Sequence, residues 1–166
     1  NQGIRTALST LFDVHGIPCL SMSTPTAALE AIVSENIGVV IQDMNFTQDT
    51  TGGEEGIHLF HEIHTRDPDL PVLLMTAWTS LETAVRLVKE GAEDYFGKPW
   101  DDDKLVNSVQ KLLGVRKLRL ENRRLRATDD RARRKLDENF DLCGIVYKSR
   151  SMQQLLTLAT SVAQSD

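Results

Sequence analysis

The sequence predicts an α/β fold, with a doubly wound parallel sheet, helices on both of its faces and a long helix at the C-terminal end. Two observations carry this prediction. Short β-branched or apolar runs, suited to strands buried on both faces, end at Asp43 and at Thr76. Around them lie stretches whose apolar residues have the three- and four-residue spacing of amphipathic helices. Strands and helices that alternate in this way form a parallel sheet covered on both sides.

The order of the elements follows from local signals. Gly16 and Gly91 are placed to end helices, and Thr24-Pro25 supplies a cap and a first-turn proline. Thr79 and Glu82 have the spacing of a capping box. The expected elements are a helix over 1–15, a strand over 17–20, a helix over 25–34, a strand over 38–43, a helix over 54–66, a strand over 71–76, a helix over 80–90, a strand over 94–96 and a helix over 101–138.

The composition indicates an ordinary globular protein: of 166 residues, 40% are hydrophobic and 26% charged. No apolar run approaches the roughly 20 residues that span a bilayer, and the N-terminus lacks the layout of a secretory signal. We therefore expect a cytoplasmic location and no membrane partner. Cys19 and Cys143 stand alone, which argues against a disulfide framework or a zinc site.

The charge is unevenly distributed along the chain. Residues 115–135 hold ten basic and three acidic residues, a net charge of +7, whereas the remainder has a net charge of −12. The same region carries a coiled-coil a/d pattern at Val115, Leu118, Asn122, Leu125, Asp129, Ala132 and Leu136. The pattern predicts a dimerising linker helix, in which Asn122 favours a two-stranded pairing. A DNA-contacting region like that of a basic zipper is the competing interpretation.

Three polar groups follow successive strands of the predicted sheet. Asp43, Thr76 and Lys98 each stand where a strand ends. The carboxyl ends of parallel strands share one edge, so we expect a carboxylate, a hydroxyl and an ammonium to meet there. Such a group suits phosphoryl transfer, with the carboxylate as nucleophile and the other two binding phosphoryl oxygens. Taken singly, each of the three could equally be a loop cap, a turn former or a solvated side chain.

The motifs are Asp43 after a Val/Ile strand, Thr76-Ala77 after Leu-Leu-Met, Gly91-Ala92 before the last strand, and Tyr-Phe-Gly-Lys-Pro at 95–99 with an aromatic next. Together they resemble the receiver domain of two-component response regulators, over residues 1 to about 113. The resemblance implies a flavodoxin-like strand order 2-1-3-4-5, Asp43 as the phosphoacceptor and Thr76 as the switch hydroxyl. It also implies Lys98 as the cation, with a cis peptide bond before Pro99. By the same resemblance Tyr95 is the aromatic that changes rotamer, and the Asn45 carbonyl and Asp43 are ligands of Mg2+.

Two departures from the family pattern stand out. The loop after Met44 is longer than usual and lacks the usual proline, which leaves its role in kinase docking open. The family's first strand and its two terminal acids are missing, because Asn1 aligns just after them. We therefore expect weak or absent Mg2+ binding and a poor phosphoacceptor in this fragment, although the intact protein would be competent. The open edges either close on each other, receive a partner chain, or reflect omitted residues.

The remainder resembles the NtrC-type, sigma-54-dependent activators, so we divide the chain into a receiver over 1–113, a linker helix over 114–139 and the beginning of an AAA+ domain over 140–166. The chain stops before any phosphate loop, and no nucleotide hydrolysis is expected. The implied partners are a histidine kinase and a second copy, paired through residues 80–138. Sigma-54 RNA polymerase and DNA would be reached only through other domains.

The sequence leaves two rival functions open. A phosphohydrolase with Asp43 as nucleophile usually has a second Asp two positions later as general acid, where Asn45 stands here. A flavodoxin-like binding module without phosphotransfer is the other.

Overall fold

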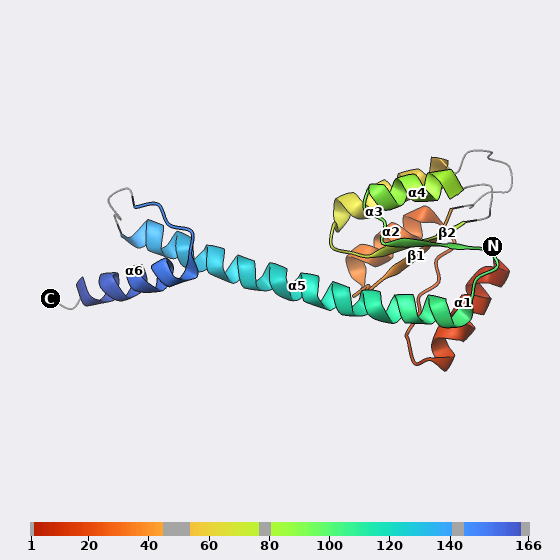
Figure 1. Cartoon of the computed structure of the whole chain (residues 1–166), viewed down its shortest axis with the longest axis horizontal. Coiled ribbons are helices and arrows are strands. Elements are labelled where there is room, and N and C mark those ends of the chain that lie inside the picture. Colours follow the sequence, from red (N-terminus) through yellow and green to blue (C-terminus); the bar gives the residue numbers. More distant parts are fainter. Residues whose placement is uncertain (1, 45–53, 77–80, 141–144, 164–166) are drawn as a thin grey trace. The chain divides into compact units, whose positions relative to one another are not determined.

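The computed structural model describes residues 2–44, 54–76, 81–140 and 145–163, with the backbone alone considered at 81–84. The chain divides into two compact units, Asn1–Leu118 and Arg119–Asp166. The elements in chain order (Figure 1) are α1 (Gln2–Val14), α2 (Pro25–Ser34), β1 (Val40–Asp43), α3 (Glu54–Arg66), β2 (Val72–Thr76), α4 (Leu81–Lys89), β3 (Asp94–Gly97), α5 (Asp102–Asn139) and α6 (Arg150–Ala163). α5 runs through both units.

The described strands of the first unit form a three-stranded parallel sheet in the order β1-β2-β3. Asp43 is in register with Met75, and Thr76 is in register with Gly97. All three strands therefore end at the same edge, as the sequence predicted. The order of these strands agrees with the last three strands of the expected receiver topology.

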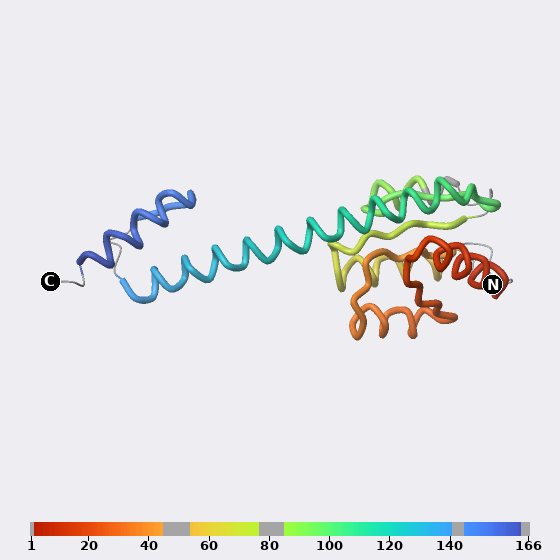
Figure 2. The backbone as a smooth tube through the Cα atoms, turned by 90° about the horizontal axis from the view of Figure 1, so that it is seen from below, coloured from red at the N-terminus to blue at the C-terminus, as the bar shows by residue number. Residues whose placement is uncertain are grey.

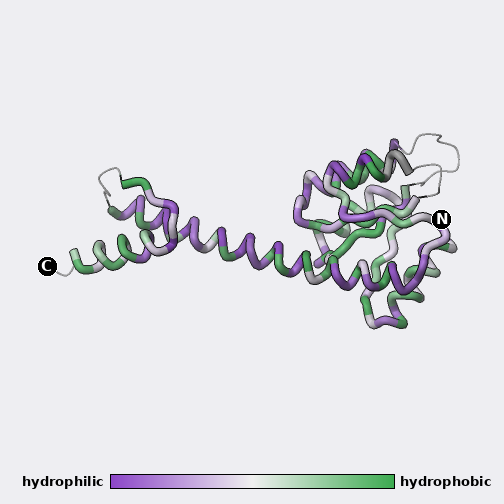
Figure 3. The backbone as a smooth tube through the Cα atoms, viewed as in Figure 1, coloured by the Kyte–Doolittle hydropathy of each residue, from purple (hydrophilic) through white to green (hydrophobic). Residues whose placement is uncertain are grey.

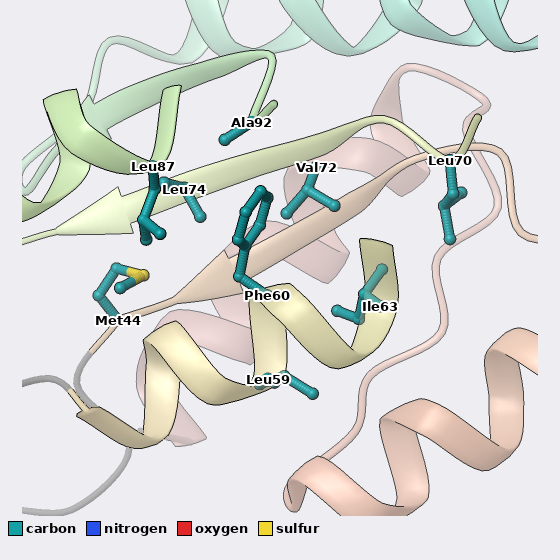
Figure 4. Packing of buried hydrophobic residues seen from close by; sticks show 9 residues of the cluster. All are labelled: Met44, Leu59, Phe60, Ile63, Leu70, Val72, Leu74, Leu87 and Ala92. Atoms are coloured by element: carbon teal, nitrogen blue, oxygen red, sulfur yellow. The ribbon is translucent and has the colours of Figure 1, made fainter. Parts of the chain in front are cut away.

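Each face of the sheet is covered by its own apolar core. Val72 and Leu74 of β2 pack on one side with residues of α3 and α4, and the ring of Phe60 lies at the centre of that cluster (Figure 4). Leu73 and Met75, which point the other way, pack with residues of α1 and α5. Because β2 is buried on both faces, its sequence is a continuous apolar run and does not alternate. This arrangement confirms the doubly wound class.

Most of the predicted helix ends are confirmed. The Ala27 amide donates to Oγ1 of Thr24 at 3.2 Å, which caps α2 at the residue before Pro25. Gly16 and Gly91 have φ angles of +66° and +119°, the left-handed region that favours glycine after a helix. Asp101 caps α5 by accepting from the Lys104 amide at 2.9 Å. The Thr79 capping box lies outside the described residues.

The predicted strand over 17–20 is wrong. The segment between α1 and α2, at the red to orange transition in Figure 2, is an irregular coil over residues 17–22. A strand exists only through hydrogen bonds to a neighbouring strand. None of the described strands lies beside this segment, since the sheet ends at β1. Local β propensity at Ile17 and Leu20 was therefore not sufficient.

The second unit consists of the later part of α5 and the helix α6. α5 has 38 residues, and its bounds differ by one residue from the prediction. Its polar character is visible as a largely purple helix in Figure 3. The buried apolar residues in the described part of this unit are Leu136 of α5, Tyr147 in the connecting segment and Leu156 of α6. Arg133 lies 4.7 Å above the ring of Tyr147. Among the described helices, none is both long and apolar enough to cross a bilayer.

Candidate functional site

The carboxyl edge of the sheet brings together the polar groups predicted from the sequence. Asp43 is the last residue of β1, Thr76 is the last residue of β2, and Lys98 follows β3 directly. The backbone amide of Lys98 donates to the carbonyl oxygen of Thr76 at 3.0 Å, which continues the ladder of β2 and β3 by one step. The Lys98–Pro99 peptide bond is cis, as expected.

Asp43 and Lys98 form an ion pair at this edge. Nζ of Lys98 lies 2.6 Å from Oδ1 of Asp43, and the two side chains are 19% and 18% exposed. Both side chains are therefore partly accessible to solvent, and the surrounding protein reduces the screening of their interaction by water. A charged hydrogen bond of this kind is stronger than a neutral one. It holds a carboxylate oxygen of Asp43 beside the ammonium group of Lys98.

Thr76 and Tyr95 differ sharply in exposure. Thr76 is 2% exposed at the end of the fully buried strand β2. Tyr95 is 36% exposed and pairs in register with Leu74. A hydroxyl that is nearly enclosed has few alternative positions, whereas a half-exposed ring has room to turn. The structure thus places Thr76 on the strand next to Asp43, and Tyr95 on β3 near the surface.

Magnesium is the ion that the resemblance implies for this edge. It requires near-octahedral oxygen ligation, usually with one or two carboxylates and several waters. Asp43 supplies one carboxylate, and Lys98 contacts it. Within the described ranges, no three or more His, Cys, Asp or Glu side chains form a group that could hold a metal ion. Asn45, the other expected ligand, lies outside those ranges. The described residues do not by themselves fit a magnesium site.

Comparison with protein families identifies the fold. The model of the response regulator receiver domain matches residues 1–110. The chain belongs to this family. Receiver domains are regulatory phosphoacceptors of two-component systems. The ion pair between Asp43 and Lys98 thus lies at the end of a strand in a domain of this class.

Relatives of this receiver domain include transcriptional regulators. The chain is 30% identical over its whole length to the C4-dicarboxylate transport transcriptional regulatory protein DctD of Rhizobium meliloti, and spans 34% of that protein. It is 32% identical over 113 residues to the DNA-binding transcriptional regulator NtrC of Escherichia coli, covering 68% of this chain and 23% of NtrC. The chain thus spans about a third or less of these relatives.

Solved structures agree with this assignment. The crystal structure of the receiver domain of a Bacteroides fragilis response regulator matches with a TM-score of 0.61 and 38% identity, covering 68% of this chain and 89% of that one. NtrX from Brucella abortus, crystallised with ADP, matches with a TM-score of 0.65 and 26% identity. The match covers 95% of this chain and 32% of the NtrX chain, so the similarity extends beyond the receiver domain.

Two contacts of the receiver were not predicted from the sequence. Nη2 of Arg116 on α5 forms a close ion pair with Oδ2 of Asp67, after α3, and both side chains are largely buried. Nε2 of Gln42, a buried polar residue of β1, donates to the carbonyl of Gly56 at 2.6 Å. This bond ties the strand that carries Asp43 to α3. A polar residue, Gln42, within an apolar strand run was the sequence signal for its contact with Gly56. No sequence signal pointed to the pair of Asp67 and Arg116.

Proposed function

We propose that the chain is the phosphorylation-controlled receiver and dimerisation module of a two-component, sigma-54-dependent transcription activator, with Asp43 accepting the phosphoryl group from a histidine kinase. The observation that carries this proposal is the 2.6 Å ion pair between Asp43 and Lys98 at the carboxyl edge of the sheet. It places an ionised, partly exposed carboxylate beside a cation, and phosphoryl transfer to a carboxylate needs both.

The chemistry can be assigned to the residues of this edge. A carboxylate oxygen of Asp43 attacks phosphorus, and the phosphorus–nitrogen bond to the kinase histidine breaks. The acylphosphate brings a charge of about −1.5 to −2 at neutral pH. Lys98 then exchanges its contact with the carboxylate for one with the phosphoryl oxygens and offsets that charge. Thr76, on the adjacent strand, supplies a hydroxyl to the same group.

The switch is a population shift between two packings of the receiver. The phosphoryl group favours the state in which the Thr76 hydroxyl reaches it, and the space that Thr76 vacates admits the ring of Tyr95. A ligand shifts such an equilibrium only by its difference in affinity for the two states. Lys98 and Thr76 provide that difference. The surface that changes is the one formed by α4, β3 and the beginning of α5.

The output passes through α5 to a second copy of the chain. The seam residues Leu118 and Leu125 are 71% and 54% exposed, which suits a pairing surface. Residues 140–166 would begin an AAA+ domain, and the similarity to DctD and NtrX over this region supports that assignment. Contacts with sigma-54 RNA polymerase and with DNA would belong to further domains of such an activator.

The two rival functions have less support. Asn45 stands where a phosphohydrolase of this kind usually has its acid, and the match to the receiver family favours a phosphoacceptor over a flavodoxin-like binding module. We therefore retain only the signalling function.

Phosphorylation with a small-molecule donor tests the proposal. The chain is incubated with acetyl phosphate at high Mg2+ concentration, and intact-mass spectrometry measures the yield of a single phosphoryl adduct. We expect a low but measurable yield, since the described residues do not complete a magnesium site. Asp43→Asn removes the nucleophile and abolishes the adduct. A beryllium fluoride mimic should likewise bind weakly, and only when Asp43 is present.

Asp13→Asn is the matched control, because Asp13 is an exposed carboxylate on α1, outside the three strands of the sheet. It should leave the adduct yield unchanged. An adduct that persists in Asp43→Asn would place the acceptor elsewhere, and a chain that forms no adduct at any Mg2+ concentration is not a phosphoacceptor.

A further inference from the structure

Gln42 is a buried polar residue next to Asp43, the proposed phosphoacceptor. It is 2% exposed and follows the apolar residues Val40 and Ile41 on β1. Its Nε2 donates to the carbonyl oxygen of Gly56 in α3 at 2.6 Å, whereas its Oε1 has no hydrogen-bond partner within the described residues. Burying an amide that is only half satisfied costs more free energy than burying an apolar side chain of similar size. Stability alone therefore does not explain a glutamine at this position.

The first turn of α3 also contacts the chain on the other side of Asp43. A Cβ atom at position 56 would lie 3.0 Å from the carbonyl oxygen of Met44 and 3.1 Å from its Cε atom, which is closer than ordinary van der Waals contact. Glycine at position 56 thus permits this approach. Met44 itself is 2% exposed, and it belongs to the same apolar cluster as Leu59 and Phe60 of α3 (Figure 4).

Asp43 therefore lies between two anchored neighbours. The side chain of Gln42 is bonded to α3, and the amide of Met44 donates to the Met75 carbonyl of β2 at 2.9 Å. Side chains alternate along a strand, so Gln42 and Met44 face α3 while Asp43 lies on the other face of β1. We call Gln42, Met44 and Gly56 the strand-end brace. It restricts the twist of β1 at the residue that carries the carboxylate.

The pair of Asp43 and Lys98 is sensitive to that twist. Oδ1 of Asp43 and Nζ of Lys98 are 2.6 Å apart, although the two residues come from the ends of different strands. A small rotation of β1 about its own axis would swing the carboxylate away from the amine. Reactions that depend on such alignment can lose about 100-fold in rate for a displacement of about 1 Å.

We propose that Gln42 is a positioning residue for Asp43. Its bond to the Gly56 carbonyl fixes the twist at the end of β1, and thereby directs the Asp43 carboxylate toward Lys98. Gln42 does not contact the phosphoryl group and acts only through Asp43. This role deepens the proposed function and rests on it for its effect on phosphoryl transfer. The alignment of Asp43 with Lys98, however, can be measured without any phosphoryl transfer.

Gln42→Met in the full chain of 166 residues tests this role. Methionine is unbranched and similar in length to glutamine, but it has no donor for the Gly56 carbonyl. The midpoint of urea unfolding should be unchanged or higher, because the unpaired Oε1 is removed together with the bond. The initial rate of adduct formation with acetyl phosphate at high Mg2+ concentration should fall at least about fivefold. Ile41→Leu conserves volume on the same strand outside the brace, and should leave this rate unchanged.

The reactivity of the Lys98 amine gives a readout that needs no phosphoryl transfer. Reductive methylation followed by peptide mass spectrometry measures the labelling rate of each lysine. In Gln42→Met, a looser charged hydrogen bond to Asp43 should raise the labelling rate of Lys98 at least about threefold. Lys104, whose side chain is 79% exposed, is the internal reference and should label at the wild-type rate. A purely structural role would change labelling only in proportion to the unfolded fraction, which the urea curve supplies.

The possible results distinguish this role from the proposed function. If the wild-type chain forms no adduct, the phosphoacceptor role fails, and the labelling of Lys98 alone decides whether Gln42 positions Asp43. Labelling of Lys98 at the wild-type rate in Gln42→Met would overturn the inference, as would adduct formation at equal rates in the two chains. If Gln42→Met does not fold, Gln42→Leu takes its place. Loss of folding in both variants would make Gln42 a structural residue and would also overturn the inference.

Discussion

The ion pair between Asp67 and Arg116 is the contact whose removal should cost the receiver most among its charged residues. The Arg116 and Asp67 side chains are only 11% and 19% exposed, and Nε and Nη1 of Arg116 have no hydrogen-bond partner within the described residues. Asp67→Asn would leave a buried guanidinium without its anion. We expect a loss of about 3 kcal/mol in the free energy of unfolding, measured by urea denaturation.

The control for this prediction is an exposed pair on the preceding helix. Arg66 and Glu62 lie 3.0 Å apart, and each side chain is about 40% exposed. Glu62→Gln should cost about 0.5 kcal/mol or less, because water screens such a pair. Equal losses from Asp67→Asn and Glu62→Gln would contradict the special role of the buried pair.

At this scale, the sequence was informative about Asp43 and Lys98 but not about Asp67 and Arg116. The first two stand at the ends of recognisable strand runs, and parallel topology brings strand ends together. Asp67 and Arg116 are 49 residues apart, in a turn and on a helix, and no local pattern relates them. Arg116 appeared as one of many basic residues of a polar helix. The phosphoacceptor and switch roles of Asp43, Thr76 and Tyr95 stay predictions.

The a/d seam of α5 should mediate pairing between copies. Leu118 and Leu125 are exposed leucines on a helix whose other residues are mostly polar. Burying them against a second copy would remove apolar surface from water. Leu118→Gln together with Leu125→Gln should shift the chain from dimer to monomer, as measured by sedimentation velocity at micromolar concentration.

Lys117→Gln with Arg124→Gln is the matched double variant, since both residues are exposed on α5 outside the seam. It should leave the association state unchanged. A monomeric wild-type chain, or a double leucine variant that still dimerises, would exclude the seam as the interface.

Among the elements, the local sequence pattern predicted α5 correctly, whereas it predicted a strand over 17–20 that the structure does not have. The extent of α5 followed from its acidic beginning and sustained helical composition, both of which are properties of the helix itself. A strand depends on a neighbour that the local sequence does not specify. Residues 17–22 therefore remain coil despite suitable residue types, because the described sheet ends at β1.

Local stability should vary strongly over the molecule. β2 is paired on both sides, and its side chains are almost fully buried. By contrast, Leu156 is the one buried residue among the described residues of α6. We expect the slowest hydrogen exchange in β2, near the global unfolding limit, and exchange in α6 faster by about two orders of magnitude or more.

Native-state exchange followed by mass spectrometry measures this difference. Residues 72–76 should retain deuterium protection longest, and added urea should bring their exchange onto the global unfolding curve. Uniform protection across β2 and α6 would mean that the two units unfold together, contrary to this prediction.

For the molecule as a whole, the sequence predicted the layers, the strand order and an open edge beside β1, but not whether that edge closes. Alternation of strands and helices determines which elements cover a sheet, and the family resemblance supplied the order. The fate of the open edge was left as three alternatives. In the structure β1 and the segment over 17–22 do not close on each other, since both line a cavity of about 500 Å3.

The alternation of side chains along β2 separates the receiver's interior into two compartments. Leu73 and Met75 belong to one, and Val72 and Leu74 belong to the other. The backbone of β2 lies between the two sets, so a change of side-chain volume on one face first alters the packing of that face.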